Sequence, residues 1–179
     1  MLWDNHHMAE MIRVLGVGNI LVEDDGLGPY AVRILESEYE FPVGVEVQDV
    51  GTPGLDFAPY LDGASAVIVV DSVTADGPPG SLHRYDKAQL LAAPIPDRTN
   101  PHQPGLRETL MACELTDSTP DEVILIGVVP GGIGNVARLG DAVRAAVPEV
   151  IAAVVQEIER LGGSPTRRAK PLDPDIWWE

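Results

Sequence analysis

Five consecutive apolar residues, Ala66-Val67-Ile68-Val69-Val70, constrain the fold of this 179-residue chain more than any other feature. Side chains of this kind favour a strand, and the absence of polar alternation means that both faces of the strand are covered. We therefore expect an α/β fold in which this run is the central strand of a mostly parallel sheet with helices on both faces. The functional crevice of such a sheet lies outside the carboxyl ends of its strands.

Strand and helix patterns alternate along the rest of the chain and predict a twisted sheet of about five strands. In the strand expected at 43–50, the alternation points Val43, Val45 and Val47 toward the core. The other expected strands cover 11–18, 81–85 and 123–129, and the other expected helices begin near residue 28 and cover 53–61 and 105–115.

A long helix near the end of the chain has the clearest periodicity. Its apolar positions recur every three or four residues, and Gly162-Gly163 ends it. Pro148 marks either the start of this helix or a kink in a helix that begins near Asp141. The apolar stripe is Val150, Ile151, Val154, Val155, Ile158 and Leu161.

The length suits a single domain, which we place at residues 11–163, between a flexible leader (1–10) and a C-terminal tail (164–179). The formal net charge of −16 argues against nucleic acid as a partner, because phosphate binding requires Lys and Arg. No apolar run approaches the roughly 18 residues of a membrane span, and the first residues lack signal-peptide features. We expect a cytoplasmic monomer in which the lone Cys113 is a buried thiol.

Three polar side chains lie where the expected strands end. Asp25 is in the glycine-rich turn after the first strand, Asp71 follows the central apolar run, and His102 is in the Pro- and Asn-rich stretch before the helix at 105–115. Two carboxylates and one imidazole form an O,O,N ligand set that suits Ni²⁺, Zn²⁺ or Fe²⁺ better than Ca²⁺. A cation would also stabilise a partly desolvated carboxylate at Asp71.

The same residues have structural interpretations. An aspartate at a strand end often caps a helix or fixes a loop, and a lone histidine in a loop is often simply exposed. Spacing alone does not bring the three residues together, so a metal site and structural roles both stay open at this point. His83 falls within an expected strand, which favours a structural role for it.

A series of short glycine- and aspartate-containing motifs runs through the chain. They are Gly16-Val17-Gly18-Asn19-Ile20-Leu21, Asp24-Asp25-Gly26-Leu27-Gly28, Asp49-Val50-Gly51-Thr52-Pro53-Gly54, Val69-Val70-Asp71-Ser72, Pro101-His102-Gln103-Pro104-Gly105-Leu106 and Gly127-Val128-Val129-Pro130. In this order and spacing they resemble the signature of the hydrogenase maturation endopeptidases. One motif alone carries little information, whereas the ordered set is specific and extends over residues 12–163.

The resemblance implies a three-layer αβα sandwich and a nickel-recognising site made of Asp25, Asp71 and His102. It implies that nickel is carried by the substrate rather than bound permanently. That substrate would be the large-subunit precursor of a nickel–iron hydrogenase, cut near its C-terminus after nickel insertion.

The chain has no motif for a covalent catalyst, neither a Gly-x-Ser-x-Gly elbow nor a His-Glu-x-x-His zinc helix. A peptidase without a nucleophile must activate water. Nickel held by substrate thiolates would complete its coordination with the three predicted ligands and align the scissile bond, or Asp71 would act as general base. Residues expected to support the site or contact the substrate are Asn19, Gly51, Thr52 and Gln103, with Gly16 and Gly18 in a tight turn at positive φ.

Other functions fit parts of the sequence. A dinucleotide-binding site needs a third glycine where Leu21 stands, and Glu23-Asp24-Asp25 would repel a pyrophosphate. A peptidyl-tRNA hydrolase shares the Gly-x-Gly-Asn opening but requires a nearby histidine, and none occurs between Gly18 and His83. A non-cleaving assembly factor that binds the same nickel centre is the remaining alternative.

Overall fold

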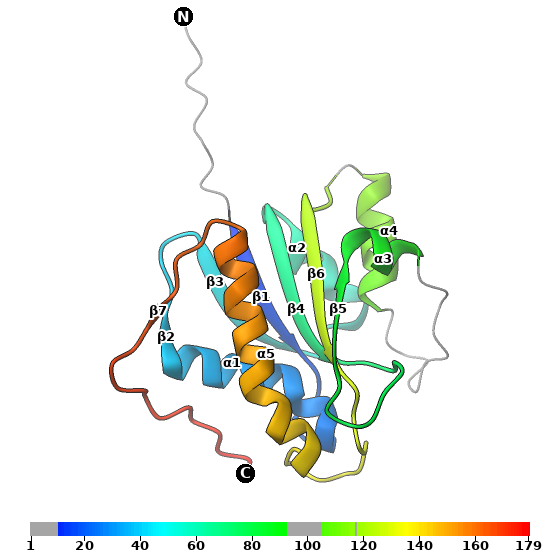
Figure 1. The fold of residues 1–179 in the computed structure, drawn as a ribbon. Coiled ribbons are helices and arrows are strands. Elements are labelled where there is room, and N and C mark those ends of the chain that lie inside the picture. Colours follow the sequence, from blue (N-terminus) through cyan, green and yellow to red (C-terminus); the bar gives the residue numbers. More distant parts are fainter. Residues whose placement is uncertain (1–10, 93–104, 117) are drawn as a thin grey trace, which may run out of the picture.

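The computed structural model describes residues 11–92, 105–116 and 118–179, and its centre is a five-stranded sheet (Figure 1). The strands are β1 (Ile12–Val17), β3 (Val45–Gly51), β4 (Ala66–Ser72), β5 (Leu82–Asp86) and β6 (Glu122–Val128). Their order is β3-β1-β4-β6-β5, in which β5 is antiparallel to β6 and the other neighbours are parallel. The apolar run at 66–70 therefore lies at the centre of a mostly parallel sheet, as predicted.

Helices cover both faces of this sheet, which confirms the three-layer α/β architecture (Figure 1). One face carries α1 (Leu27–Glu38) and α5 (Asp141–Arg160). The other carries the 3₁₀ turn η2 (Gly54–Phe57), α2 (Ala58–Leu61), α3 (Lys87–Ala92) and α4 (Leu106–Leu115), of which α3 was not predicted. None of the helices in the described part of the chain has the length and apolar character that a bilayer crossing needs.

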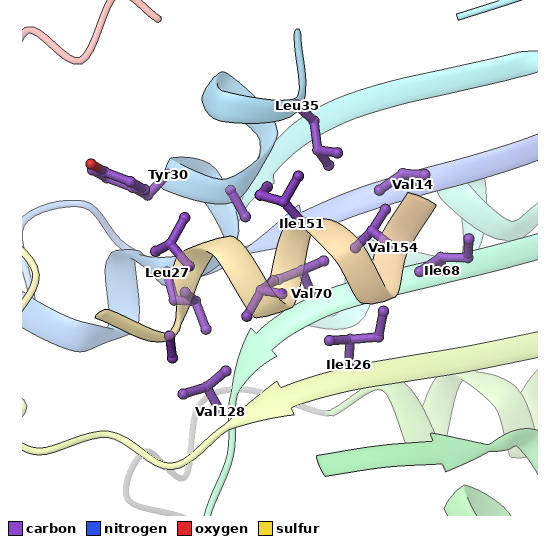
Figure 2. Packing of buried hydrophobic residues seen from close by; sticks show 14 of the residues in the cluster. Val14, Leu27, Tyr30, Leu35, Ile68, Val70, Ile126, Val128, Ile151 and Val154 are labelled. Carbon is purple, nitrogen blue, oxygen red and sulfur yellow. The ribbon is translucent and has the colours of Figure 1, made fainter. Parts of the chain in front are cut away.

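Successive residues of β4 complete the two cores. Ile68 and Val70 pack against α1 and α5 (Figure 2), whereas Val67 and Val69 lie in the opposite core, which also buries Cys113 as predicted. Burial of a Val or Ile side chain contributes about 1.5–3 kcal/mol relative to its exposure. Because β4 is buried on both faces, the residues at its carboxyl end occupy a firmly fixed position.

Two glycines allow α1 to start directly against β1. A Cβ atom on Gly16 would lie 2.3 Å from the Gly28 carbonyl oxygen, and one on Gly28 would lie 2.2 Å from the Val17 oxygen. The prediction of a positive φ holds for Gly18 (φ 138°) but is wrong for Gly16, whose importance is this close approach. The turn that carries Asp25 is thereby held against the end of β1.

The predicted inward orientation of Val43 is wrong. The side chain is fully exposed, because Val45 N donates to the Pro42 oxygen and Gly44 adopts a φ of 95°, which makes a turn before β3 begins. Val45 and Val47 are partly buried and pack against the core, as predicted.

Two other elements have bounds that can be compared with the prediction, the end of β4 and the start of α5. β4 continues through Asp71 to Ser72, and Asp71 pairs with Gly127 of β6 instead of following the strand. α5 begins at Asp141 with Pro148 inside it, so the longer of the two predicted helices is the observed one.

Residues after α5 pack back along α1. β7 (Thr166–Arg167) pairs antiparallel with β2 (Tyr39–Glu40) in a second, two-stranded sheet. Further along, Leu172 N donates to the Ser37 oxygen at 2.9 Å. The tail packs along the α1 layer, and its last residue, Glu179, reaches the start of α5, where it pairs with Arg144 and accepts a hydrogen bond from Leu139 N at 3.1 Å (Figure 1).

Candidate functional site

Asp25 lies in the turn between β1 and α1, which includes the 3₁₀ segment η1 (Glu23–Gly26). Its Oδ2 accepts a hydrogen bond from Asn19 N at 2.9 Å, and its Oδ1 lies 3.4 Å from the Ser72 hydroxyl, which donates to it. The Asn19 side chain accepts a bond from Leu21 N at 3.0 Å and so stabilises its own turn. The turn thus presents the Asp25 carboxylate to the carboxyl end of β4.

Asp71 and Asp25 line the same cavity, of about 110 Å³, together with Gly18, Ser72 and Ile133. Asp71 is reached from this cavity but is otherwise densely surrounded by protein. Burial and the nearby Asp25 carboxylate hold the pKa of Asp71 well above its usual range, and the Ser72 N–H, which donates to Asp71 Oδ1 at 2.7 Å, opposes this only in part. The site therefore favours either a proton on Asp71 or a cation between the two carboxylates.

A second cavity, of about 90 Å³, lies beside the first, and Asp71 and Val17 belong to both linings. Its other walls are mostly apolar and include Phe57 and Leu125, with Thr52 at its edge. Thr52 thus lines a cavity next to Asp71, whereas Gly51 ends β3 with its N–H bound to the Asp49 carboxylate at 3.0 Å. Asp71 therefore borders two small cavities.

The third predicted ligand, His102, and its neighbour Gln103 lie outside the described residues. Within the described ranges, no group of three His, Cys, Asp or Glu side chains is arranged to hold a metal ion. The described site therefore provides two carboxylates, and the O,O,N ligand set with His102 stays a prediction.

Two further carboxylates, which sequence reasoning treated only as part of an acidic run, fasten a distant loop to this site. Asp24 is buried and accepts hydrogen bonds from Gly131 N, Gly132 N and Gly140 N at 2.7, 3.1 and 2.7 Å. Glu23 accepts one from Gly134 N at 2.8 Å, and Glu23 N donates to the Val136 oxygen at 2.7 Å. We call residues 130–140 the anchored loop; two of its residues, Pro130 and Ile133, line the cavity with Asp25 and Asp71.

Comparison with known proteins agrees with the motifs. The hydrogenase maturation protease family model matches residues 29–157, which is more than half of the chain. The hydrogenase expression/formation protein HoxM of Cupriavidus necator is 29% identical over 165 residues, which span 92% of this chain and 82% of that protein. The hydrogenase 2 maturation protease of Escherichia coli is 30% identical over 152 residues, which span 84% of this chain and 92% of that protein.

A solved structure has the same fold. The hydrogenase maturating endopeptidase HybD from E. coli aligns with a TM-score of 0.80 and 29% sequence identity, over 89% of this chain and 98% of that one. The α/β fold of this chain is therefore that of a hydrogenase maturation endopeptidase. The chain belongs to the hydrogenase maturation protease family, as its motifs predicted.

Proposed function

We propose that this protease removes the C-terminal extension of a nickel–iron hydrogenase large-subunit precursor after nickel has been inserted. In this proposal nickel arrives with the substrate and is recognised by Asp25, Asp71 and His102. The observation that carries the proposal is the position of Asp25 and Asp71 in one small cavity at the carboxyl edge of the sheet, with no Lys or Arg among the described residues that line it.

Two carboxylates in one site repel each other, and the repulsion is relieved by a proton or by a cation. Burial raises the pKa of Asp71 most, and repulsion from the Asp25 carboxylate raises it further. A nickel centre presented by the precursor would supply the missing positive charge. Recognition would then depend on metal loading, because a precursor without nickel offers nothing to offset the two negative charges.

Hydrolysis would proceed by attack of water on the scissile carbonyl carbon. Asp71 is the residue best placed to act as the general base, since it lies between the two cavities and loses its proton when a cation enters the site. It would take a proton from the attacking water and return it to the leaving amine nitrogen as the peptide bond breaks. Asp25, held by Asn19 N, would keep the metal centre and therefore the scissile bond in place.

A non-cleaving assembly factor would use the same ligands to bind the same centre. Membership of a protease family favours cleavage. The two functions differ in one observable, because only cleavage shortens the precursor.

The test is to mix the purified chain with hydrogenase large-subunit precursors, with and without inserted nickel, and to determine the masses of the products. We expect loss of a C-terminal peptide from the nickel-loaded precursor only. Binding without a change in mass would support the assembly factor, and equal cleavage of both forms would remove the nickel-recognition role of Asp25, Asp71 and His102.

A further inference from the structure

Three exposed apolar side chains lie on the two loops that border the carboxylate cavity, the turn before Asp25 and the anchored loop. Leu21, Ile133 and Val136 expose 59%, 51% and 47% of their surface, although each is large enough to belong in a core. Ile133 lines the cavity that contains Asp25 and Asp71. Leu21 lies in the turn that leads to Asp25, and this turn is bonded to Val136 through Glu23 N. We call these three residues the apolar rim.

The apolar rim is held in place by polar contacts. Glu23 and Asp24 accept four backbone hydrogen bonds from the anchored loop, and Glu23 keeps a φ of 40°, which is unfavourable for a residue with a side chain. The buried Asp24, the partly buried Glu23 and a strained backbone thus hold an exposed apolar surface in one arrangement. Such a surface loses little conformational entropy when a partner covers it.

The size of the cavity limits how much of a substrate can enter it. A cavity of about 110 Å³ admits only a few atoms of a protein, so a peptide bond that enters it brings the surrounding polypeptide onto the rim. Exposed apolar side chains beside a site are typical of protein interfaces. Electrostatic attraction alone would not bring an acidic protein substrate to this site, because the chain has a formal net charge of −16 and the site itself contains carboxylates.

Resting on the function proposed above, we propose that Leu21, Ile133 and Val136 form the docking surface for the folded body of the precursor protein. The rim contacts an apolar patch of the precursor beside its metal centre, while the C-terminal segment enters the carboxylate cavity. Docking on the rim therefore raises the affinity for a protein substrate, whereas hydrolysis of the peptide bond depends on the carboxylates.

The test replaces rim residues with a neutral polar residue, which leaves the charge at the site unchanged. Leu21→Gln and Val136→Gln, alone and combined, are compared with Val43→Gln, because Leu21 and Val136 are the two rim residues that do not line the cavity. Val43 is fully exposed and precedes β3, at the amino edge of the parallel sheet and so opposite the site. Cleavage of the nickel-loaded precursor is followed by mass spectrometry at several precursor concentrations, and precursor binding is titrated separately.

We expect the double variant to raise KM and the dissociation constant by about tenfold or more while kcat stays within about twofold. Val43→Gln should change none of these. If KM and the dissociation constant were unchanged in the double variant, the docking surface would be overturned. It would also be overturned if analytical ultracentrifugation showed a wild-type dimer that the rim variants dissociate, because the rim would then contact a second copy of the chain. Wild-type binding that depends on the rim, but without cleavage, would keep the docking surface and overturn the protease activity.

Discussion

Asp24 and Asp25 are adjacent in sequence, yet they belong to two regions with opposite chemistry. Asp24 is buried and its carboxylate is satisfied by three backbone N–H groups of the anchored loop. Asp25 faces the cavity it shares with Asp71, where one N–H and one hydroxyl reach it. A carboxylate that the protein satisfies itself stabilises the fold, whereas one left with free acceptor positions is available to a ligand.

The comparison also explains why the site tolerates repulsion between Asp25 and Asp71. The turn that carries Asp25 is held from both sides, by the close contact of Gly16 with Gly28 and by the bonds of Asp24 to the anchored loop. These contacts maintain the position of Asp25 although its own environment is unfavourable for a second carboxylate. Asp24 thus stabilises the fold, and its neighbour Asp25 stays available to a ligand.

The largest effect is expected for Asp71→Asn. The substitution removes both the general base and a predicted nickel ligand, so we expect cleavage of the nickel-loaded precursor to fall by about 10³-fold or more. The protein should stay folded, because an amide has nearly the same shape. The measurement is the rate of precursor shortening by mass spectrometry, together with circular dichroism. Asp62→Asn, which makes the same charge change at an exposed position, is the control, and near-wild-type cleavage by Asp71→Asn would remove Asp71 from the mechanism.

The contrast between Asp24 and Asp25 predicts opposite effects of their substitution on stability and on activity. Asp24→Ala leaves three backbone N–H groups without their acceptor and should lower the free energy of unfolding by about 3 kcal/mol. Asp25→Ala removes weaker contacts and should cost about 1 kcal/mol or less, yet it should lose most of the cleavage activity. Urea denaturation and the cleavage assay test both. Equal destabilisation by the two substitutions would show that the two carboxylates are not divided in this way.

Much of this arrangement could be predicted from the sequence, because some signals are local. The central position of β4 follows from the unbroken apolar run at 66–70, and Asp71 could be placed at the functional edge because parallel strands end there together. Val43 shows where a local signal fails, since alternation continued in the sequence across a turn that Gly44 makes in the structure.

The role of Asp24 could not be predicted in the same way. Its partners are backbone N–H groups more than 100 residues away, and every non-proline residue has such a group, so no side-chain pattern marks them. The glycines at 131, 132, 134 and 140 indicate only that the backbone there can approach another group closely. The two carboxylates of the candidate site could be predicted because they lie at or after the carboxyl ends of strands. The role of Asp24 could not, because it depends on the tertiary fold.

A smaller effect is a pH-dependent stability difference between Asp71→Asn and the wild type. In the folded protein, burial and Asp25 raise the pKa of Asp71 above the ordinary value of 3.8, which the unfolded chain retains. Below that value both states are protonated and the carboxyl group costs nothing. As the pH rises from there through the raised pKa, the wild type loses stability relative to the variant, and the difference then stays constant.

Urea denaturation of both proteins over a pH series measures this difference. We expect Asp71→Asn to be the more stable protein at neutral pH and the advantage to shrink toward acid pH. A difference that does not change with pH would mean that the carboxyl of Asp71 titrates alike in the folded and unfolded chains, and the repulsion from Asp25 would then not hold.

The smallest effect concerns Glu23, at the border between the two regions. Glu23→Ala removes the bond from Gly134 N and should cost about 1 kcal/mol. Glu23→Gly removes the same bond but relieves the backbone at a φ of 40°, so it should cost about 0.5 kcal/mol less than the alanine variant. The two free energies of unfolding, measured side by side, separate the side-chain bond from the backbone strain. If glycine proved as costly as alanine, the strained turn would contribute nothing to the energetics of the anchored loop, and the side-chain bond alone would account for the role of Glu23.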